Sequence, residues 1–522
     1  MKHNLLTDKI FDVNVGCEDE SLNLPEILSA LSRESPTIIS FNKLMPHQKQ
    51  AWYSFLVQLA AIACFRAGLK EPPLKEKKWK EILRNLTSDW PRDEPWHLIV
   101  NDLSKPAFFQ PPVPEGTLRE FKKIAEPDID GTVDLLVLTK NHDIKKGRIR
   151  HTSCELWAYS LITVQTMGGY PGRGYTQISR INSGYGNRPL VSMVPGIEWN
   201  MKFSRDLRVL VNNRNKVISN HQFLKGDKEL LWLYEWDGKA PLRLDDLAPY
   251  YIEVCRRARF TKKNGKIIMN IKSTNNCRIS GAKQHRGNVG DPWIPIEKKG
   301  KKALTIGKSG FRYDKLCEIL FSGNYKTNIC SAFNSKENYL YCSALSRGKG
   351  KTTGIHERTI QIPEPVKNML VNKSGLAAQM SQDWIEDAIS ARIRHLKPAL
   401  LSLIQGAPGE LEWQDTRAGK WLSEFDRRVD LIFFQALWKV LAEANSSGKA
   451  DSEITEKAVW KWRNQLIDIA IEIFLEAKEA LPIPSAQKYR TIAKSTNRLE
   501  RSLTSFLKDA YDANRVSDRK AI

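Results

Sequence analysis

The sequence WLSEFDRRVDLIFFQA, residues 421–436, decides the fold class of the C-terminal part of the chain. Its apolar side chains recur at steps of 4, 4, 3 and 4 residues, at Trp421, Phe425, Val429, Ile432 and Ala436. Residues at this spacing share one face of an α-helix. The stretch therefore predicts an amphipathic helix that packs against other helices.

A second apolar stripe follows, with steps of 3, 4, 3 and 4 residues, at Val459, Trp462, Leu466, Ile469 and Ile473. Helical patterns also cover residues 377–404 and 486–511, and breaks rich in Gly, Pro or Ser lie at 406–409, 445–449 and 482–485. Antiparallel helices joined by short loops bury such stripes most simply. Residues 376–522 are therefore predicted to form a four-helix bundle.

The chain before the bundle mixes helical and strand patterns. An N-terminal strand is predicted over residues 4–15, a buried helix from Pro46, and helical segments over 76–104 and 154–167. Residues 190–345 carry short β-branched and aromatic runs separated by Gly, Asn and Pro, which is typical of a strand-rich, irregular module. The predicted fold class is α+β, with a large irregular mixed α/β domain over residues 1–375 followed by the bundle.

The composition of the 522 residues is that of a globular protein, with 41% hydrophobic and 27% charged residues. We find no apolar run long enough for a membrane span and no signal peptide at the N-terminus, so we expect a cytoplasmic protein without a membrane partner. The eight cysteines form no C-x-x-C pair and are expected to be reduced and mostly buried.

The formal net charge of +22 is concentrated in two segments. Residues 256–351 hold 22 Lys or Arg against 5 Asp or Glu, and residues 140–188 hold 8 against 2. Such clustering is expected of a face that binds a polyanion. For the run KKGKK at 298–302, a solvated surface is the simpler interpretation.

Residues 168–189, GGYPGRGYTQISRINSGYGNRP, contain six glycines. A backbone with so few side chains can bring its N–H groups close to a ligand. Arg173, Arg180 and Arg188 are expected to add positive charge at that surface, and tyrosines add flat faces, a mixture that suits nucleic acid. A glycine-rich structural loop remains the alternative.

Two catalytic interpretations fail on spacing. Gly350-Lys351-Thr352 ends like a phosphate-binding loop, but Leu345 stands where that motif needs glycine, so the stretch fits better as a cationic turn before a strand. His142-Asp143 lacks further ligands for a metal-dependent nuclease, and Cys255 and Cys277 lack partners for a zinc ribbon. Neither catalytic residues nor a metal or cofactor site is predicted.

Three motifs in order, KNHD at 140–143, QTMGGYPGRGYTQISRINSGYGNRP at 165–189 and GKGKTTGIHER at 348–358, precede the helical region. In this combination the chain resembles CasA, the large subunit of the type I-E CRISPR surveillance complex Cascade. The resemblance spans nearly the whole chain. It departs from the family at Ile10-Phe11-Asp12, where Trp-Ile-Pro is common, and at Thr352, where some relatives have glutamine.

The resemblance implies a non-enzymatic subunit that reads the protospacer-adjacent motif (PAM) of double-stranded DNA from the minor groove and initiates unwinding for R-loop formation in antiviral defence. It implies partners as well: the target duplex, the 5′ handle of the guide RNA, the other Cascade subunits and a recruited helicase-nuclease. The alternatives are a general RNA- or DNA-binding scaffold without motif readout, and a nucleotide- or metal-dependent nucleic-acid enzyme.

The resemblance also assigns roles to residues. The glycine loop that approaches the groove is Gly172, Arg173 and Gly174, and the wedge beneath the motif is Lys351, Thr352 and Thr353. A groove-reading lysine is implied before Trp293, where Lys283 matches best and Gln284 and Arg286 are close rivals. The loop that meets the guide and neighbouring subunits carries Lys140, Asn141, His142, Lys145 and Lys146.

Overall fold

The computed structural model describes residues 2–35, 38–123, 153–167, 180, 188–221, 226–263, 265–274, 276–279, 281–326, 328–331, 338–348, 351–371, 375–447 and 451–518. The chain divides into two compact units. The first comprises Met1–Phe311 and Asn324–Gln361, and the second comprises Arg312–Gly323 and Ile362–Ile522. Strands lie in the first unit and long helices in the second, so the predicted α+β class is confirmed.

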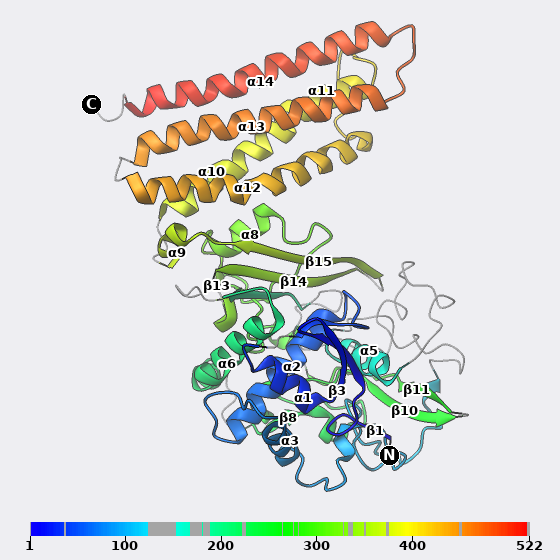
Figure 1. Cartoon of the computed structure of the whole chain (residues 1–522). Helices are drawn as coiled ribbons and strands as arrows, with labels where there is room; N and C mark the ends of the chain where they lie inside the picture. Colours follow the sequence, from blue (N-terminus) through cyan, green and yellow to red (C-terminus); the bar gives the residue numbers. More distant parts are fainter. Residues whose placement is uncertain are drawn as a thin grey trace. The chain divides into compact units, whose positions relative to one another are not determined.

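The helices of the first unit are α1 (Leu24–Leu31), α2 (Lys49–Arg66), α3 (Glu76–Asn85), α5 (Cys154–Thr166), α6 (Trp199–His221) and α7 (Gly281–Gln284), with short 3-10 turns η1 (Glu94–Trp96), η4 (Leu231–Leu233), η5 (Leu244–Asp246) and η6 (Ile329–Ser331). Helix α2, predicted from the apolar run after Pro46, forms the centre of this unit. Its residues from Gln50 to Cys64 are all buried, and it packs against α5, α6 and β9 (Figure 1). A helix that is apolar on every face is stable only in such a position.

The strands of the first unit form small sheets around α2. Antiparallel sheets have the orders β3 (Glu18–Leu22), β2 (Phe11–Val15), β4 (Ile38–Phe41); β10 (Arg257–Lys263), β11 (Lys266–Lys272), β6 (Lys122–Lys123); and β15 (Lys351–Gln361), β14 (Tyr339–Gly348), β7 (Leu190–Val194). Strand pairs join β1 (Lys2–Asn4) to β5 (His97–Ile99), β8 (Lys228–Leu230) to β9 (Leu247–Ile252), and β12 (Ile296–Glu297) to β13 (Tyr325–Lys326).

Three predictions for the first unit need correction. The predicted strand over 4–15 is interrupted by a turn, so that only β1 and β2 form. The helical pattern over 76–104 ends with α3, after which the chain continues as η1 and β5. Helix α6 was missed inside the strand-rich module because polar residues dominate its sequence, although Phe203, Leu207 and Leu210 are buried along one side.

The second unit contains α8 (Tyr313–Leu320), α9 (Glu364–Val371), α10 (Gly375–Ser390), the π-helical turn η7 (Ala391–Leu396), α11 (Lys397–Ile404), the 3-10 turn η8 (Thr416–Ala418), α12 (Gly419–Ser447), α13 (Asp451–Ala480) and α14 (Lys488–Asp518). Helices α10 and α11 continue one another through η7 and pack with α12, α13 and α14 as a four-helix bundle (Figure 1). The π-turn precedes Pro398, which lacks an N–H and displaces the regular helical hydrogen bond there.

The apolar stripes that predicted the bundle are largely buried. Phe425 and Val429 have no exposed surface, but the buried side of α12 continues through Phe433 and Leu437, while Ile432 and Ala436 are half-buried. The second stripe is confirmed at Trp462, Leu466, Ile469 and Ile473. No helix among the described residues combines the length and apolarity that a membrane crossing needs.

The segment Arg312–Gly323 belongs to the second unit although the sequence around it belongs to the first. Asp426 of α12 pairs with Arg312 at 2.6 Å and with Arg392 at 2.8 Å. The ring of Tyr313 stacks on Phe433, with centroids 4.7 Å apart. Sequence reasoning placed the whole of residues 1–375 in one domain, because contacts so remote in sequence leave no local pattern.

Candidate nucleic-acid interface

The residues assigned to the wedge lie at the end of the antiparallel hairpin formed by β14 and β15 (Figure 1). The hairpin register runs from Tyr339 opposite Gln361 to Gly348 opposite Lys351. It shifts beside Ser346, which pairs with Gly354, while Arg347 pairs with Thr352. Thr353 is therefore the extra residue of a β-bulge, a feature that bends a strand and redirects its side chains.

A buried polar contact holds this bulge from beneath. The hydroxyl of Ser346, which is fully buried, lies 3.1 Å from the hydroxyl of Thr353 and 3.0 Å from Nε2 of His356. A Cβ at Gly354 would lie 2.5 Å from that Nε2, and a Cβ at Gly310, where φ is +68°, would lie 2.4 Å from Nδ1. A side chain at Gly354 would displace the His356 ring, and the positive φ at Gly310 additionally favours glycine there. Burial lowers the pKa of His356, so the imidazole is neutral at pH 7.

Farther along the hairpin, Lys202 of α6 has its ammonium among aromatic rings. Its Nζ lies 4.1 Å from the ring centre of Tyr341 on β14, 5.3 Å from Trp199 and 5.7 Å from Tyr53. Such contacts stabilise a cation that has lost its water. Burial nevertheless dominates and lowers the pKa of Lys202 to about 8. Tyr341 of the hairpin therefore packs against the buried amine of Lys202.

The same tyrosine joins the two strands of the hairpin. The hydroxyl of Tyr341 donates a hydrogen bond to Glu357 of β15 at 3.3 Å, and Lys49 of α2 lies 3.7 Å from that carboxylate. The hairpin is therefore fixed to the core of its own unit by contacts with α6 and α2.

Several predicted site residues lie outside the described part of the chain, namely Lys140, Asn141, His142, Lys145, Lys146, Gly172, Arg173 and Gly174. The backbone of Lys283 lies in the short helix α7, and those of Lys351 and Thr352 begin β15. Thr353 is exposed. Of the rivals to Lys283, Gln284 is exposed, and Arg286 donates a hydrogen bond to the Gly300 carbonyl at 3.0 Å. These assignments stay predictions.

Arg180 and Arg188 are not surface cations, contrary to the sequence-based expectation. Both are almost fully buried and converge on the carboxylate of Asp291, Arg188 at 2.7 Å and Arg180 at 3.6 Å. Arg180 also donates to the Tyr251 carbonyl at 2.7 Å and lies over the Tyr251 ring. The two arginines therefore anchor residues on either side of 181–187 to the core.

Several arginines of the basic segment 256–351 are buried as well. Arg256, Arg257, Arg259 and Arg278 are each less than 5% exposed. The guanidinium of Arg259 donates hydrogen bonds to the carbonyls of Val100, Asp102 and Lys105, and burial lowers its pKa to about 10. The positive charge counted from the sequence is therefore an overestimate of what could reach a polyanion, whereas Lys298 and Lys299 are exposed as expected.

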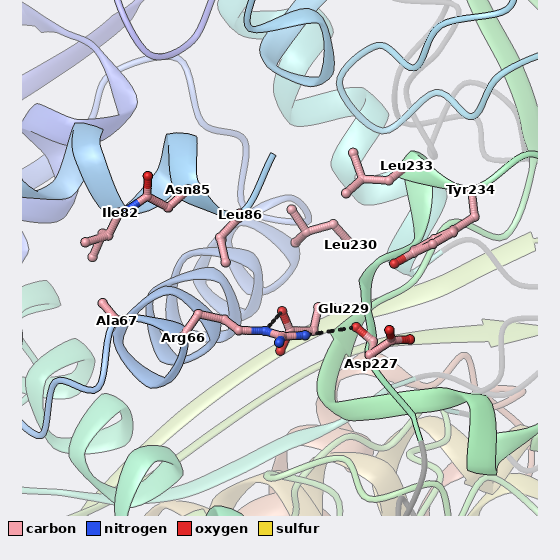
Figure 2. Close-up of a pocket in the computed structure, with 10 residues that line it drawn as sticks. All are labelled: Arg66, Ala67, Ile82, Asn85, Leu86, Asp227, Glu229, Leu230, Leu233 and Tyr234. Atoms are coloured by element: carbon pink, nitrogen blue, oxygen red, sulfur yellow. Dashed lines mark hydrogen bonds and ion pairs between the residues drawn. The ribbon is translucent and has the colours of Figure 1, made fainter. Parts of the chain in front are cut away.

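A pocket of about 270 Å³ lies between the ends of α2 and α3 and the segment 227–234 (Figure 2). Arg66 points into it and donates to Glu229 at 2.9 Å, and Arg214 lies 3.6 Å from the same carboxylate. Burial raises the pKa of Glu229. This carboxylate is occupied by two arginines of its own chain, which is typical of a structural ion pair.

Metal-binding chemistry finds no support in the described ranges, where no group of three or more His, Cys, Asp or Glu could hold an ion. All eight cysteines are free thiols. The Sγ of Cys255 lies 3.3 Å from the Val164 carbonyl, in a buried position where the segment between β9 and β10 contacts α5.

Sequence reasoning missed the residues that support the hairpin and the anchor. Ser346 and Lys202 lie outside the three motifs, His356 lies in the third motif but was assigned no role, and Asp291 is an ordinary acidic residue in sequence. In the structure, residues 354–359 alternate between half-buried and exposed, with His356 half-buried and Ile355 exposed, an order that the polarity of these residues does not predict. The partners of these residues are brought together only by the fold.

No family model matches the chain, and no curated protein matches it. Solved structures do. CasA (Cse1) from Thermus thermophilus superimposes with a TM-score of 0.59 and 12% identity over 97% of this chain and 99% of that one. Cse1 from Acidimicrobium ferrooxidans gives 0.60 and 13% over 98% and 99%, and Cse1 from Thermobifida fusca gives 0.61 and 14% over 97% and 98%. Along nearly its whole length, the chain therefore has the CasA (Cse1) fold.

Proposed function

We propose that the chain is the non-catalytic large subunit of an RNA-guided CRISPR surveillance complex of the Cascade type. In this role it recognises the PAM in double-stranded DNA from the minor groove and starts the unwinding that forms an R-loop. The observation that carries the proposal is the β-bulge at Thr353 of the β14–β15 hairpin, which Ser346 and His356 hold in place beside the wedge motif on a CasA fold.

The geometry of the hairpin suits strand opening. An inserted turn must remain in place while it separates stacked bases, which costs a few kcal/mol for each step. Ser346, His356 and Gly354 fix the bulge, and Tyr341 and Glu357 join the strands behind it. We infer that Lys351, Thr352 and Thr353 enter beneath the motif.

We assign motif contact to Gly172, Arg173 and Gly174, whose small backbone would approach the groove, and to Lys283 as the groove-reading cation. Minor-groove readout distinguishes few base pairs, so we expect several related motifs to be accepted. Lys140, Asn141, His142, Lys145 and Lys146 are proposed to meet the 5′ handle of the guide RNA and neighbouring subunits. Arg180 and Arg188, which follow these residues in the chain, hold positions 180 and 188 in the core.

We further propose that the chain acts in the cytoplasm, where free thiols stay reduced, and that it helps recruit a helicase-nuclease to the displaced strand. It requires no cofactor in this scheme. The target duplex, the guide and the other Cascade subunits are its partners.

The test uses the assembled complex and duplexes that differ only in the motif. We expect motif-dependent binding, and we expect Gly172→Asp to weaken it by about 30-fold or more, because bulk and negative charge enter the closest approach to DNA, while the complex still assembles. Equal binding of all duplexes would favour a scaffold without readout. Cleavage or nucleotide hydrolysis by the purified chain with Mg²⁺ or Zn²⁺ would favour an enzyme.

A further inference from the structure

A buried carboxylate, Asp206 of α6, lies between the anchor of the glycine stretch and the wedge hairpin. It has no exposed surface. One oxygen accepts hydrogen bonds from the hydroxyl of Tyr53 at 2.9 Å and from Nε1 of Trp293 at 2.7 Å. The other accepts from the hydroxyl of Ser192 and from Nη1 of Arg205, both at 2.9 Å. Four donors from four positions in the chain thus fix a single side chain.

On one side, the network reaches the anchor of the glycine stretch. The backbone N–H of Trp293 donates to Asp291 at 3.0 Å, and Asp291 receives Arg188 and Arg180. Trp293 therefore contacts both buried carboxylates, Asp291 through its backbone and Asp206 through its indole. Any shift of the anchor displaces a residue that is bonded to Asp206.

On the other side, the network reaches the hairpin. Ser192 lies on β7, directly opposite Tyr341 of β14 in the sheet. Tyr53 faces the ammonium of Lys202, which lies against the ring of the same Tyr341. One of the four donors to Asp206 therefore lies beside the strand that leads to the wedge, and a second reaches that strand through Lys202.

We propose that Asp206 is a positioning residue that keeps the anchored end of the glycine stretch in register with the wedge hairpin. Motif contact at the first element then sets the position of the second. This inference rests on the proposed function, because it assigns motif contact and strand opening to those two elements. Coupling between two sites that do not touch is carried by hydrogen-bond and salt-bridge networks that can take two arrangements, and Asp206 lies in the network that connects these two elements.

The first experiment tests, without DNA, whether Asp206 stabilises the hairpin strand β14 and its neighbour β7. Hydrogen exchange is followed in peptides that cover β7 and β14 in Asp206→Asn, with Glu229→Gln as the matched control. Glu229 is also a buried carboxylate of the first unit, with a hydrogen bond from Arg66 of α2 and an ion pair with Arg214 of α6. We expect faster exchange in both strands in Asp206→Asn and in neither strand in the control.

The second experiment measures opening in the assembled complex at saturating concentration, with a fluorescent base in the first target base pairs. In the wild type a correct motif accelerates opening. Asp206→Asn should reduce this acceleration by at least about fivefold while the affinity for motif duplex changes little, and Glu229→Gln should leave both unchanged. If Asp206→Asn does not assemble, Tyr53→Phe removes a single donor and is expected to act in the same direction.

Unchanged motif dependence in Asp206→Asn or Tyr53→Phe, or equal losses in the Glu229→Gln control, would overturn the positioning role. A wild-type complex that opens DNA without regard to the motif would instead overturn the proposed function. The two failures are therefore distinguishable.

Discussion

Two cations of the same basic segment, Arg259 and Lys298, have opposite surroundings. Arg259 on β10 has no exposed surface and donates to the carbonyls of Val100, Asp102 and Lys105. Lys298 is exposed, and only its backbone is held, through an N–H that donates to the Asn324 carbonyl at 2.8 Å. One residue builds the core and the other is available to a partner, although both count equally in the net charge of the sequence.

The difference follows from the chemistry of the two side chains. A guanidinium carries five donors in a rigid fork and is weakly hydrated, so it can satisfy several carbonyls in a loop-rich interior. An ammonium is compact and strongly hydrated, and it stays in water unless a partner replaces that water. In this protein, lysine is therefore the better indicator of a polyanion-binding face, and arginine must first be checked for burial.

The largest effect on stability is expected when Arg259, the buried cation of this pair, is replaced. Arg259→Leu should destabilise the first unit by about 3–5 kcal/mol, because several buried carbonyls lose their donor at once. Thermal unfolding of the purified chain measures the loss. Lys262→Ala on the exposed part of the same strand is the control and should shift stability by less than about 0.5 kcal/mol. Similar losses in the two variants would mean that Arg259 does not have a special structural role.

The second prediction concerns the residues assigned to the wedge, which are proposed to contact DNA. Replacing Lys351-Thr352-Thr353 by three glycines should slow R-loop formation on paired DNA by about 30- to 100-fold, or about 2–3 kcal/mol, because nothing fills the opened base step. Binding to a pre-melted target should stay nearly intact, and negative supercoiling should restore part of the rate. R-loop kinetics on both targets provide the measurement.

Lys298 and Lys299 changed to glycine serve as the control for the wedge and should not affect opening selectively. Equal defects on paired and pre-melted targets would contradict the wedge assignment. So would ATP turnover by the purified chain that Lys351→Ala abolishes, because a nucleotide-binding loop would then explain the motif better.

Much of the fold could be predicted from the sequence where helices have a continuous apolar side. The stripe through Trp462 and Leu466 identified α13, and the apolar run after Pro46 identified α2. Helix α6 was missed because its buried residues are separated by charged and amide side chains that pair within the tertiary structure. The place of Arg312–Gly323 could not be predicted because it depends on contacts with Asp426 and Phe433, which are more than a hundred residues away.

The candidate site was predictable to the level of motifs. The order of the three motifs indicated the CasA fold, and the described residues of the third motif, Gly348 and 351–358, lie on the two strands of one hairpin. The supports of that hairpin could not be found, because Gly310 and Lys202 come from other parts of the chain and meet His356 and Tyr341 only in the folded unit. Charge counting failed for Arg180 and Arg188, whose shared partner Asp291 is distant in sequence.

Lys202 is a buried lysine, and its effect on the pH dependence of stability can be compared with that of the exposed Lys298. The pKa of Lys202 is lowered to about 8 from 10.5, so between these pH values the unfolded chain binds more protons than the folded one. Stability must then rise with pH across this window. We expect the wild type to gain about 1–3 kcal/mol relative to Lys202→Met between pH 8 and 10.5. Urea unfolding at several pH values measures this gain, and Lys298→Met, at an exposed position, should run parallel to the wild type.

The smallest effects are expected on DNA affinity when lysines of the basic segment are changed to alanine. If Lys283 reaches acceptors in the groove, Lys283→Ala should weaken binding of the assembled complex to motif-bearing DNA by about 1 kcal/mol more than to unrelated duplex. Lys298→Ala with Lys299→Ala should weaken both duplexes alike and flatten the dependence of log affinity on log salt by up to about one unit for each phosphate that the variant no longer neutralises. Titrations at several salt concentrations separate the two behaviours. Identical losses on both duplexes in the Lys283 variant would leave it a phosphate-binding cation like its neighbours, because a residue that reads the groove must distinguish one sequence from another.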